Sequence, residues 1–170
     1  MKGLFSMRRL VGVGATLGMV GAALVSSPAP SSAATTTAVC AFVNAVATAS
    51  PGVPLKGTPP GASYSFSGKA NCVLNGKSEA STVSSSGTYT SIVCGTGSAT
   101  GSASIVGSKG DSATGNIKIT FVAGQGALTG KISINGGAPI TVAGPVSIAP
   151  KTGNCVTPVT QFTVSAVIAG

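Results

Sequence analysis

Apolar and polar residues alternate with a period of two along most of the chain. The clearest run places apolar residues at even positions from Tyr64 to Leu74, and further runs occupy 117–121, 128–134, 140–148 and 162–168. Such alternation predicts half-buried β-strands, and the Gly, Ser, Pro and Asn clusters between the runs predict turns. With weaker segments around 79–83, 88–94 and 99–106, the pattern predicts eight or nine strands.

The predicted fold is therefore all-β: an antiparallel two-sheet β-sandwich of the Ig-like, Greek-key type. Residues 35–49 are the exception, because their Ala-rich sequence suits either a short helix or a first strand, and both alternatives stay open. The segment PGVPLKGTPP at Pro51–Pro60 predicts a stiff loop that crosses an edge or an end of the sandwich.

One hairpin can be predicted to its register. A three-residue loop at Asn135–Gly137 places Ile132 opposite Ile140 and Gly130 opposite Val142, so that both apolar sets share one face. A two-residue loop would pair even with odd positions and expose one set. Gly137 is expected to take the left-handed conformation at the end of this loop.

The N-terminal segment 1–34 is typical of a cleaved secretory signal peptide. Three cations, Lys2, Arg8 and Arg9, precede an uncharged apolar run from Leu10 to Val25. That run is shorter than the ~20 apolar residues of a membrane span, so no transmembrane segment is expected after cleavage. The prediction is a secreted, extracellular protein with a single domain over residues 35–170.

The mature region is weakly basic and almost without charge clusters. Seven dispersed lysines against Glu79 and Asp111 leave a net charge of +5. A nucleic-acid binder would cluster its cations and interleave aromatic rings, so no nucleic-acid partner is expected. Weak attraction to an anionic cell-wall polymer fits the charge.

The mature region holds four cysteines, Cys40, Cys72, Cys94 and Cys155. An even number in an exported chain predicts two structural disulfides, with three possible connectivities. We favour Cys40–Cys72 and Cys94–Cys155. The spacings lack CxxC pairs and the chain has no His, so neither a metal site nor another cofactor is expected.

Catalysis is not expected. Without His there is no Ser–His–Asp triad or Cys–His dyad. Glu79 and Asp111 are interpreted as surface charges, not as a catalytic pair. The glycine-rich segment Gly95–Gly101 precedes a strand pattern instead of the helix of a nucleotide loop. A Ser–Lys hydrolase formed by an unrecognised pair across strands is the remaining enzyme hypothesis.

The segments GTYTSIVCGTGSATG (Gly87–Gly101) and GNCVTPVTQFTV (Gly153–Val164) carry a resemblance. In these, and in its Ala-rich signal sequence, the chain resembles small secreted β-sandwich proteins of high-GC Gram-positive (actinobacterial) type. The likeness covers most of the mature region in style and cysteine placement. It implies a compartment and a fold, and carries no function or site residue.

The sequence thus predicts a non-catalytic structural or interaction protein at or near the cell envelope. The alternative is a module that binds an extracellular polysaccharide or cell-wall polymer. That hypothesis uses a flat Ser/Thr-rich sheet face with Tyr64 and Tyr89 nearby, and an aromatic pair exposed on one sheet face would favour it.

Overall fold

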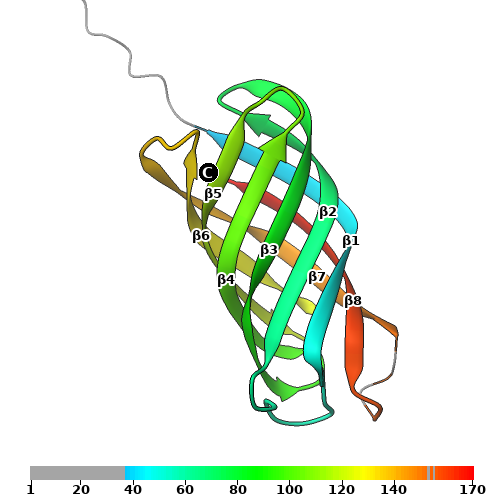
Figure 1. The fold of residues 1–170 in the computed structure, drawn as a ribbon. Coiled ribbons are helices and arrows are strands. Elements are labelled where there is room, and N and C mark those ends of the chain that lie inside the picture. Colours follow the sequence, from blue (N-terminus) through cyan, green and yellow to red (C-terminus); the bar gives the residue numbers. More distant parts are fainter. Residues whose placement is uncertain (1–36, 153, 155) are drawn as a thin grey trace, which may run out of the picture. The chain divides into compact units, whose positions relative to one another are not determined.

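Antiparallel strands wind into one closed barrel in the computed structural model, which describes residues 37–152, 154 and 156–170 (Figure 1). Each strand pairs with the next in sequence, and the last pairs with the first. The eight strands of the described residues are β1 (Ala38–Val53), β2 (Ser63–Leu74), β3 (Lys77–Val93), β4 (Thr96–Gly107), β5 (Ser112–Val122), β6 (Gln125–Ile134), β7 (Pro139–Thr152) and β8 (Val159–Ala169). The predicted signal peptide, 1–34, lies outside the described residues.

The predicted two-sheet sandwich is wrong, because β1 and β8 pair with each other. Their register runs from Val39 opposite Ala169 to Val53 opposite Val159, so that the sheet has no free edge. A sandwich and a barrel both produce strands with one buried face, and the alternation of residues is the same in the two folds. Only the pairing of the two ends of the chain separates them.

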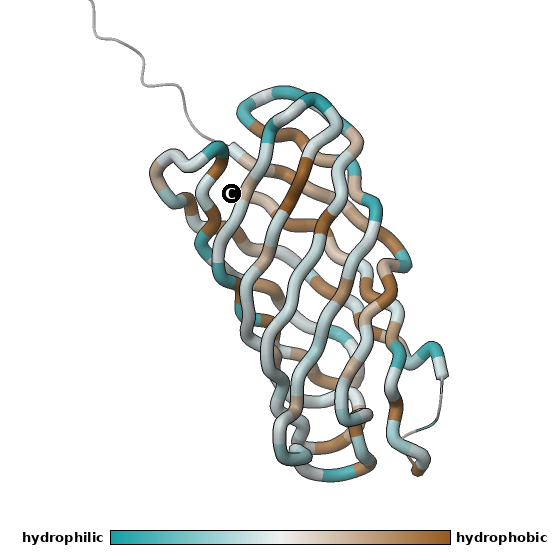
Figure 2. Tube along the Cα trace, viewed as in Figure 1, coloured by the Kyte–Doolittle hydropathy of each residue, from teal (hydrophilic) through white to brown (hydrophobic). Residues whose placement is uncertain are grey.

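Strand alternation sets which side chains point into the barrel. Along β2 the even positions Phe66, Ala70, Cys72 and Leu74 are buried inside and the odd ones are mostly exposed, as predicted. Figure 2 shows the same interleaving of apolar and polar residues along the strands. In β1 the buried positions change from even to odd at a bulge after Phe42, where Asn44 has a φ of 56°.

Two other strand predictions are now settled. Residues 38–49 belong to β1, so the open choice between helix and strand is resolved in favour of a strand. The two weak strands expected around 79–83 and 88–94 are one continuous strand, β3, of 17 residues. The run of Ser and Thr in the middle of β3 lacks the apolar alternation, so the sequence predicted two short strands in place of one long one.

The predicted hairpin register is confirmed, but the turn conformation is not. Ile132 lies opposite Ile140, and Gly130 lies opposite Val142. Asn135 and Gly136, not Gly137, have positive φ values, and the Gly137 N–H donates to the Ile134 carbonyl at 2.9 Å. This is a two-residue turn of the type I′ kind. One extra residue before Pro139 then restores the even-to-even register.

The predicted Cys40–Cys72 disulfide is confirmed. The two residues are direct partners on β1 and β2, both point into the barrel, and their Cα atoms are 4.1 Å apart. It is the one disulfide that the structure shows within the described residues, where the sequence predicted two. The other predicted pair includes Cys155, which lies outside those residues.

The interior around this disulfide is densely filled. Branched side chains from neighbouring strands close the half of the barrel where β2 ends and β3 begins. Six of these branched side chains are at most 3% exposed: Leu74, Val83, Ile105, Ile132, Ile134 and Val142. This packed half forms the floor beneath the other half, and the buried core continues from it to the residues around the cavity.

Removing the disulfide should destabilise the barrel without changing its fold. We expect the double variant Cys40→Ala, Cys72→Ala to lose about 2–4 kcal/mol of unfolding free energy, because the cross-link closes a 32-residue loop. Guanidinium unfolding measures the loss. The matched control is Thr48→Ala, Ser65→Ala, which removes an exposed hydroxyl pair between the same strands (2.9 Å) and should lose about 0.5 kcal/mol. Equal losses in both variants would contradict this assignment.

Candidate functional site

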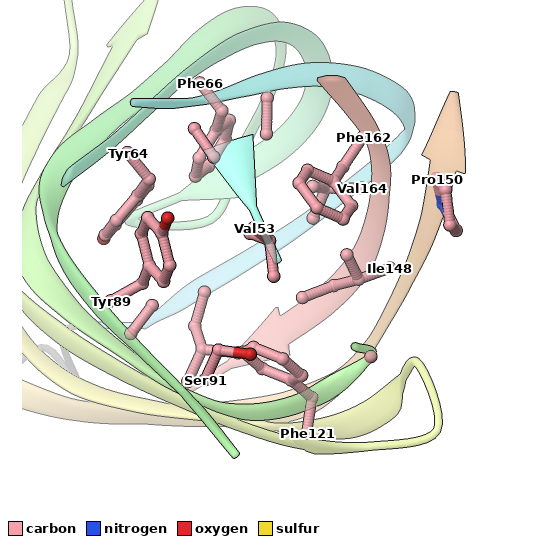
Figure 3. A pocket seen from close by; sticks show the side chains of 15 residues that line it. Val53, Tyr64, Phe66, Tyr89, Ser91, Phe121, Ile148, Pro150, Phe162 and Val164 are labelled. Carbon is pink, nitrogen blue, oxygen red and sulfur yellow. The ribbon is translucent and has the colours of Figure 1, made fainter. Parts of the chain in front are cut away.

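The second half of the barrel interior is hollow (Figure 3). A partly enclosed cavity of about 90 Å³ lies at the end where β3, β5 and β7 finish and β4 and β8 begin. Its walls are formed by residues from seven of the strands and the β3–β4 turn: Ala47, Ala49, Val53, Tyr64, Phe66, Tyr89, Ser91, Gly95, Ala99, Ile119, Phe121, Ile148, Pro150, Phe162 and Val164.

The hollow arises because small residues occupy inward positions at this end. Ala47 and Ala49 on β1, and Ala99 on β4, line the cavity with short side chains, whereas the packed half has Leu74, Ile132 and Ile134 among its buried side chains. An eight-stranded barrel is just wide enough for side chains to fill its interior or for one small ligand to be held there. Sequence reasoning missed these alanines. The signal was present in the change of inward residue size along the strands, but it has meaning only once the barrel is known.

Aromatic rings gather at this cavity. Five of them point into it from four different strands (Figure 3): Tyr64, Phe66, Tyr89, Phe121 and Phe162. Beneath them the ring of Phe42 stacks on Phe66, with 5.6 Å between ring centroids. These six rings are all the aromatic residues in the described part of the chain. The few aromatic side chains of the described residues therefore all lie at or directly beneath the cavity.

The position of Tyr64 depends on a glycine in the facing wall. A Cβ atom on Gly101 would lie 2.7 Å from the Tyr64 hydroxyl and 2.1 Å from the backbone oxygen of Ser86. Such contacts are far shorter than van der Waals distance, so no larger residue fits here without a shift of the wall. The glycine therefore gives the tyrosine ring the room to reach across the interior.

The polar groups of the cavity are already hydrogen-bonded to the protein. The hydroxyls of Tyr64 and Ser85 are 3.0 Å apart, Tyr89 donates to the carbonyl of Pro51, and Ser91 donates to the carbonyl of Val93. Burial raises the pKa of Tyr64, against a smaller lowering by its Ser85 hydrogen bond, and burial also raises the pKa of Tyr89. Both phenols are therefore neutral near neutral pH, and the cavity holds no charge.

The loop between β1 and β2 is fastened beside the mouth of the cavity. The Thr58 hydroxyl donates to the Ser91 carbonyl at 3.1 Å and accepts from the Ser91 N–H at 2.8 Å. The Cys94 N–H donates to the carbonyl of Leu55 at 3.1 Å. These contacts hold the loop against the end of β3, while Val53 at the end of β1 points into the cavity.

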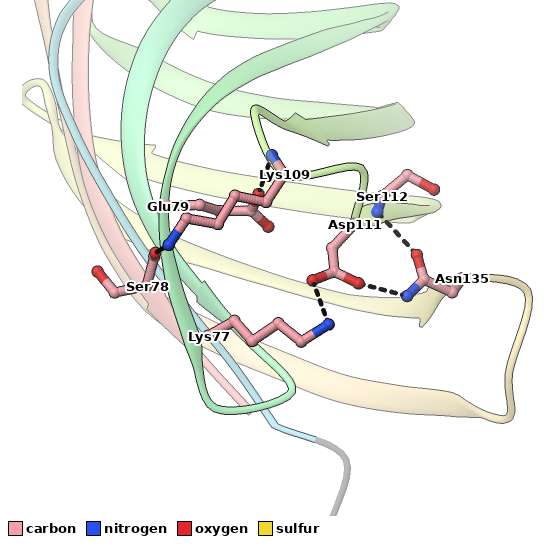
Figure 4. Close-up of polar contacts among 7 residues, drawn as sticks. All are labelled: Lys77, Ser78, Glu79, Lys109, Asp111, Ser112 and Asn135. Atoms are coloured by element: carbon pink, nitrogen blue, oxygen red, sulfur yellow. Dashed lines mark hydrogen bonds and ion pairs between the residues drawn. The ribbon is translucent and has the colours of Figure 1, made fainter.

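A polar cluster occupies the opposite end of the barrel (Figure 4). Glu79 accepts a hydrogen bond from the Lys109 N–H at 2.8 Å. Asp111 accepts one from the Asn135 side chain at 2.7 Å and forms an ion pair with Lys77 at 3.5 Å. The Asn135 side-chain oxygen in turn accepts from the Ser112 N–H at 2.8 Å. The two carboxylates therefore fasten the β4–β5 and β6–β7 turns.

The interpretation of Glu79 and Asp111 as surface charges is wrong. Glu79 is 5% exposed and Asp111 is 6% exposed. Both lie on inward positions at a barrel end, where turns fold over them, and strand alternation alone does not reveal such cover. Hydrogen bonding to Asn135, with a further contribution from Lys77, lowers the pKa of Asp111 against the opposing effect of burial. Within the described residues, no group of three His, Cys, Asp or Glu is placed to hold a metal ion.

The structure weakens two hypotheses drawn from the sequence. Tyr64 and Tyr89 point into the barrel, so they are not available on an outer sheet face to stack against sugar rings. All seven lysines of the described residues are exposed. None of them therefore has the buried setting that the Ser–Lys hypothesis requires. The glycine-rich segment Gly95–Gly101 forms a turn and the start of β4.

The chain matches no protein-family model, no curated protein and no solved structure. Its resemblance to small exported proteins of high-GC Gram-positive bacteria therefore stays a prediction. Across the described residues, no helix has the length and apolar character needed to cross a membrane.

Removal of the Asp111 carboxylate should lower the stability of the fold most at neutral pH. Because its folded pKa is lowered, the group stabilises the fold above its unfolded pKa, and this stabilisation is lost as the pH falls through the folded pKa. We expect Asp111→Asn to unfold at lower denaturant than the parent at about pH 7, and the gap to close at about pH 2. Asn116→Ala, on the exposed wall of β5, is the control and should show no such pH dependence. A gap that stays constant with pH would contradict the assigned role.

Proposed function

We propose that this protein is a non-catalytic, exported interaction protein that binds the apolar part of a small molecule in the hollow half of its barrel. The observation that carries the proposal is the cavity itself, lined by aromatic and aliphatic side chains whose few hydroxyls already have protein partners. A polar ligand would find no unpaired donor among those hydroxyls. An apolar one gains about 25 cal/mol for each Å² of surface removed from water.

The size of the cavity narrows the ligand class. At about 90 Å³ it is smaller than the ~150 Å³ apolar cavity that accepts benzene, and far below the ~300–1,000 Å³ of sites that enclose a drug-sized molecule. It therefore suits a slender alkyl or isoprenoid tail, or part of a single ring. The rest of the ligand would stay at the mouth, in contact with water.

Other features support the cellular setting of the proposal. A buried disulfide is typical of proteins that fold in an oxidising compartment, in agreement with the signal peptide predicted over residues 1–34. The exposed lysines and the absence of His from the chain give no support to catalysis. Tyr64 and Tyr89 point into the barrel, so they do not form an exposed aromatic pair that would support polysaccharide binding.

A series of unbranched alcohols tests the proposal. Titration from n-butanol to n-octanol, followed by methyl NMR shifts of the cavity residues, should show affinity rising about fourfold per added methylene, because each buried CH₂ contributes ~0.8 kcal/mol. The rise should stop once the tail fills the cavity. An affinity that does not change with chain length, or shifts confined to the outer wall, would refute the proposal.

Filling the cavity gives the matched genetic test. Ala99→Leu places a larger side chain into the cavity and should weaken n-hexanol binding by at least about tenfold, since the bound tail and the new side chain compete for one volume. Ala127→Leu, exposed on β6, is the control and should bind as the parent does. Ile119→Ala enlarges the cavity instead and should favour the longer alcohols. Unchanged binding in both cavity variants would contradict the assignment.

A further inference from the structure

The mouth of the cavity is surrounded by exposed apolar side chains. Leu55 is 58% exposed, Val93 is 44% exposed and Val122 is 69% exposed. Leu55 belongs to the β1–β2 loop, Val93 ends β3, and Val122 ends β5. We name these three residues the mouth rim.

Backbone contacts make the mouth rim continuous. Lys56 forms a bridge with Val93, and the Cys94 N–H donates to the Leu55 carbonyl at 3.1 Å. The β3–β4 turn then joins the β5–β6 turn, because the Gly124 N–H donates to the Gly95 carbonyl at 2.8 Å. The rim is thus one surface along the end of the barrel, adjoining the cavity.

Charge at this end of the barrel is entirely positive. Lys56 in the β1–β2 loop and Lys151 near the end of β7 are both exposed here. The only two acidic side chains in the whole sequence, Glu79 and Asp111, are buried at the opposite end. The C-terminal Gly170 also lies at that opposite end, where it pairs with Ala38.

We infer that the mouth rim docks on an anionic lipid surface, with Lys56 and Lys151 contacting the headgroups. Apolar side chains flanked by lysines, with no carboxylate near them, are the combination that partitions into the boundary of an anionic bilayer. The inference rests on the proposed function, because docking in this orientation opens the cavity to the bilayer. An apolar tail can then pass between lipid and protein without crossing water.

A second exposed apolar area does not carry the same inference. Val39, Val43 and Val167 lie on the outer wall of β1 and β8, where Val39 is opposite Ala169 and Ala41 is opposite Val167. Neither strand has a lysine. This area lacks both the cations and the cavity, and it supplies a control surface of similar chemistry.

Vesicle co-sedimentation tests the inference. The full mature protein should bind vesicles of phosphatidylcholine with phosphatidylglycerol, and bind pure phosphatidylcholine vesicles at least about tenfold more weakly, since each lysine near an anionic surface contributes about fivefold. Lys56→Gln, Lys151→Gln should lower binding by more than about tenfold. Lys118→Gln, Lys131→Gln removes the same charge from the outer walls of β5 and β6 and should change it by less than about threefold. Equal losses would show attraction by net charge alone and overturn the inference.

The apolar contribution has its own pair of variants. Leu55→Ser, Val122→Ser should weaken binding to anionic vesicles, whereas Val43→Ser, Val167→Ser should not. The reverse order would place the contact on the β1–β8 wall and overturn the inference. The variants Lys56→Gln, Lys151→Gln and Leu55→Ser, Val122→Ser should both keep the n-hexanol affinity of the parent in vesicle-free buffer. If the parent protein binds anionic vesicles but not n-hexanol, the proposed function is refuted and the docking is not. If it binds n-hexanol but not the vesicles, the docking is refuted and the proposed function is not.

Discussion

Every feature of this protein depends on the pairing of β1 with β8. That pairing closes the sheet, removes both of its free edges and gives each strand an inner and an outer face. Closure links the first and last strands of the described chain, so its entropic cost is set by a long stretch of polypeptide. The Cys40–Cys72 disulfide ties β1 to β2 inside the ring and lessens that cost by constraining the unfolded chain. Without closure there would be neither an enclosed core nor a cavity.

The size of the inward residues then divides the interior in two. Leu74, Ile132, Ile134 and the disulfide lie in one half, while Ala47, Ala49 and Ala99 at the other end leave space that aromatic rings only partly occupy. The polar groups follow the same division. Two buried carboxylates fasten the turns at the packed end, and neutral, hydrogen-bonded hydroxyls line the hollow end. The buried carboxylates that hold the turns and the candidate binding cavity therefore lie at opposite ends of the barrel.

Local features of this fold could be read from the sequence, and long-range ones could not. Alternation identified the strands from Tyr64 onward, the Ile132–Ile140 register followed from burial, and the Cys40–Cys72 pair was predicted correctly. The predicted sandwich was wrong because the alternation of apolar and polar residues does not show whether the first and last strands pair. The buried settings of Glu79 and Asp111 were missed because turns from other strands cover them. The cavity was missed because Ala47 and Ala99, far apart in sequence, become neighbours of one space only inside a barrel.

The central claim is that the hollow half of the barrel holds an apolar tail. Intermolecular NOEs between the terminal methyl of bound n-hexanol and the protein test it most directly, because they locate the tail. The claim predicts NOEs to the rings of Phe66, Phe121 and Phe162, which line the cavity from three different strands. NOEs confined to Val43 and Val167 on the outer wall, or no NOEs from a saturating ligand, would contradict it.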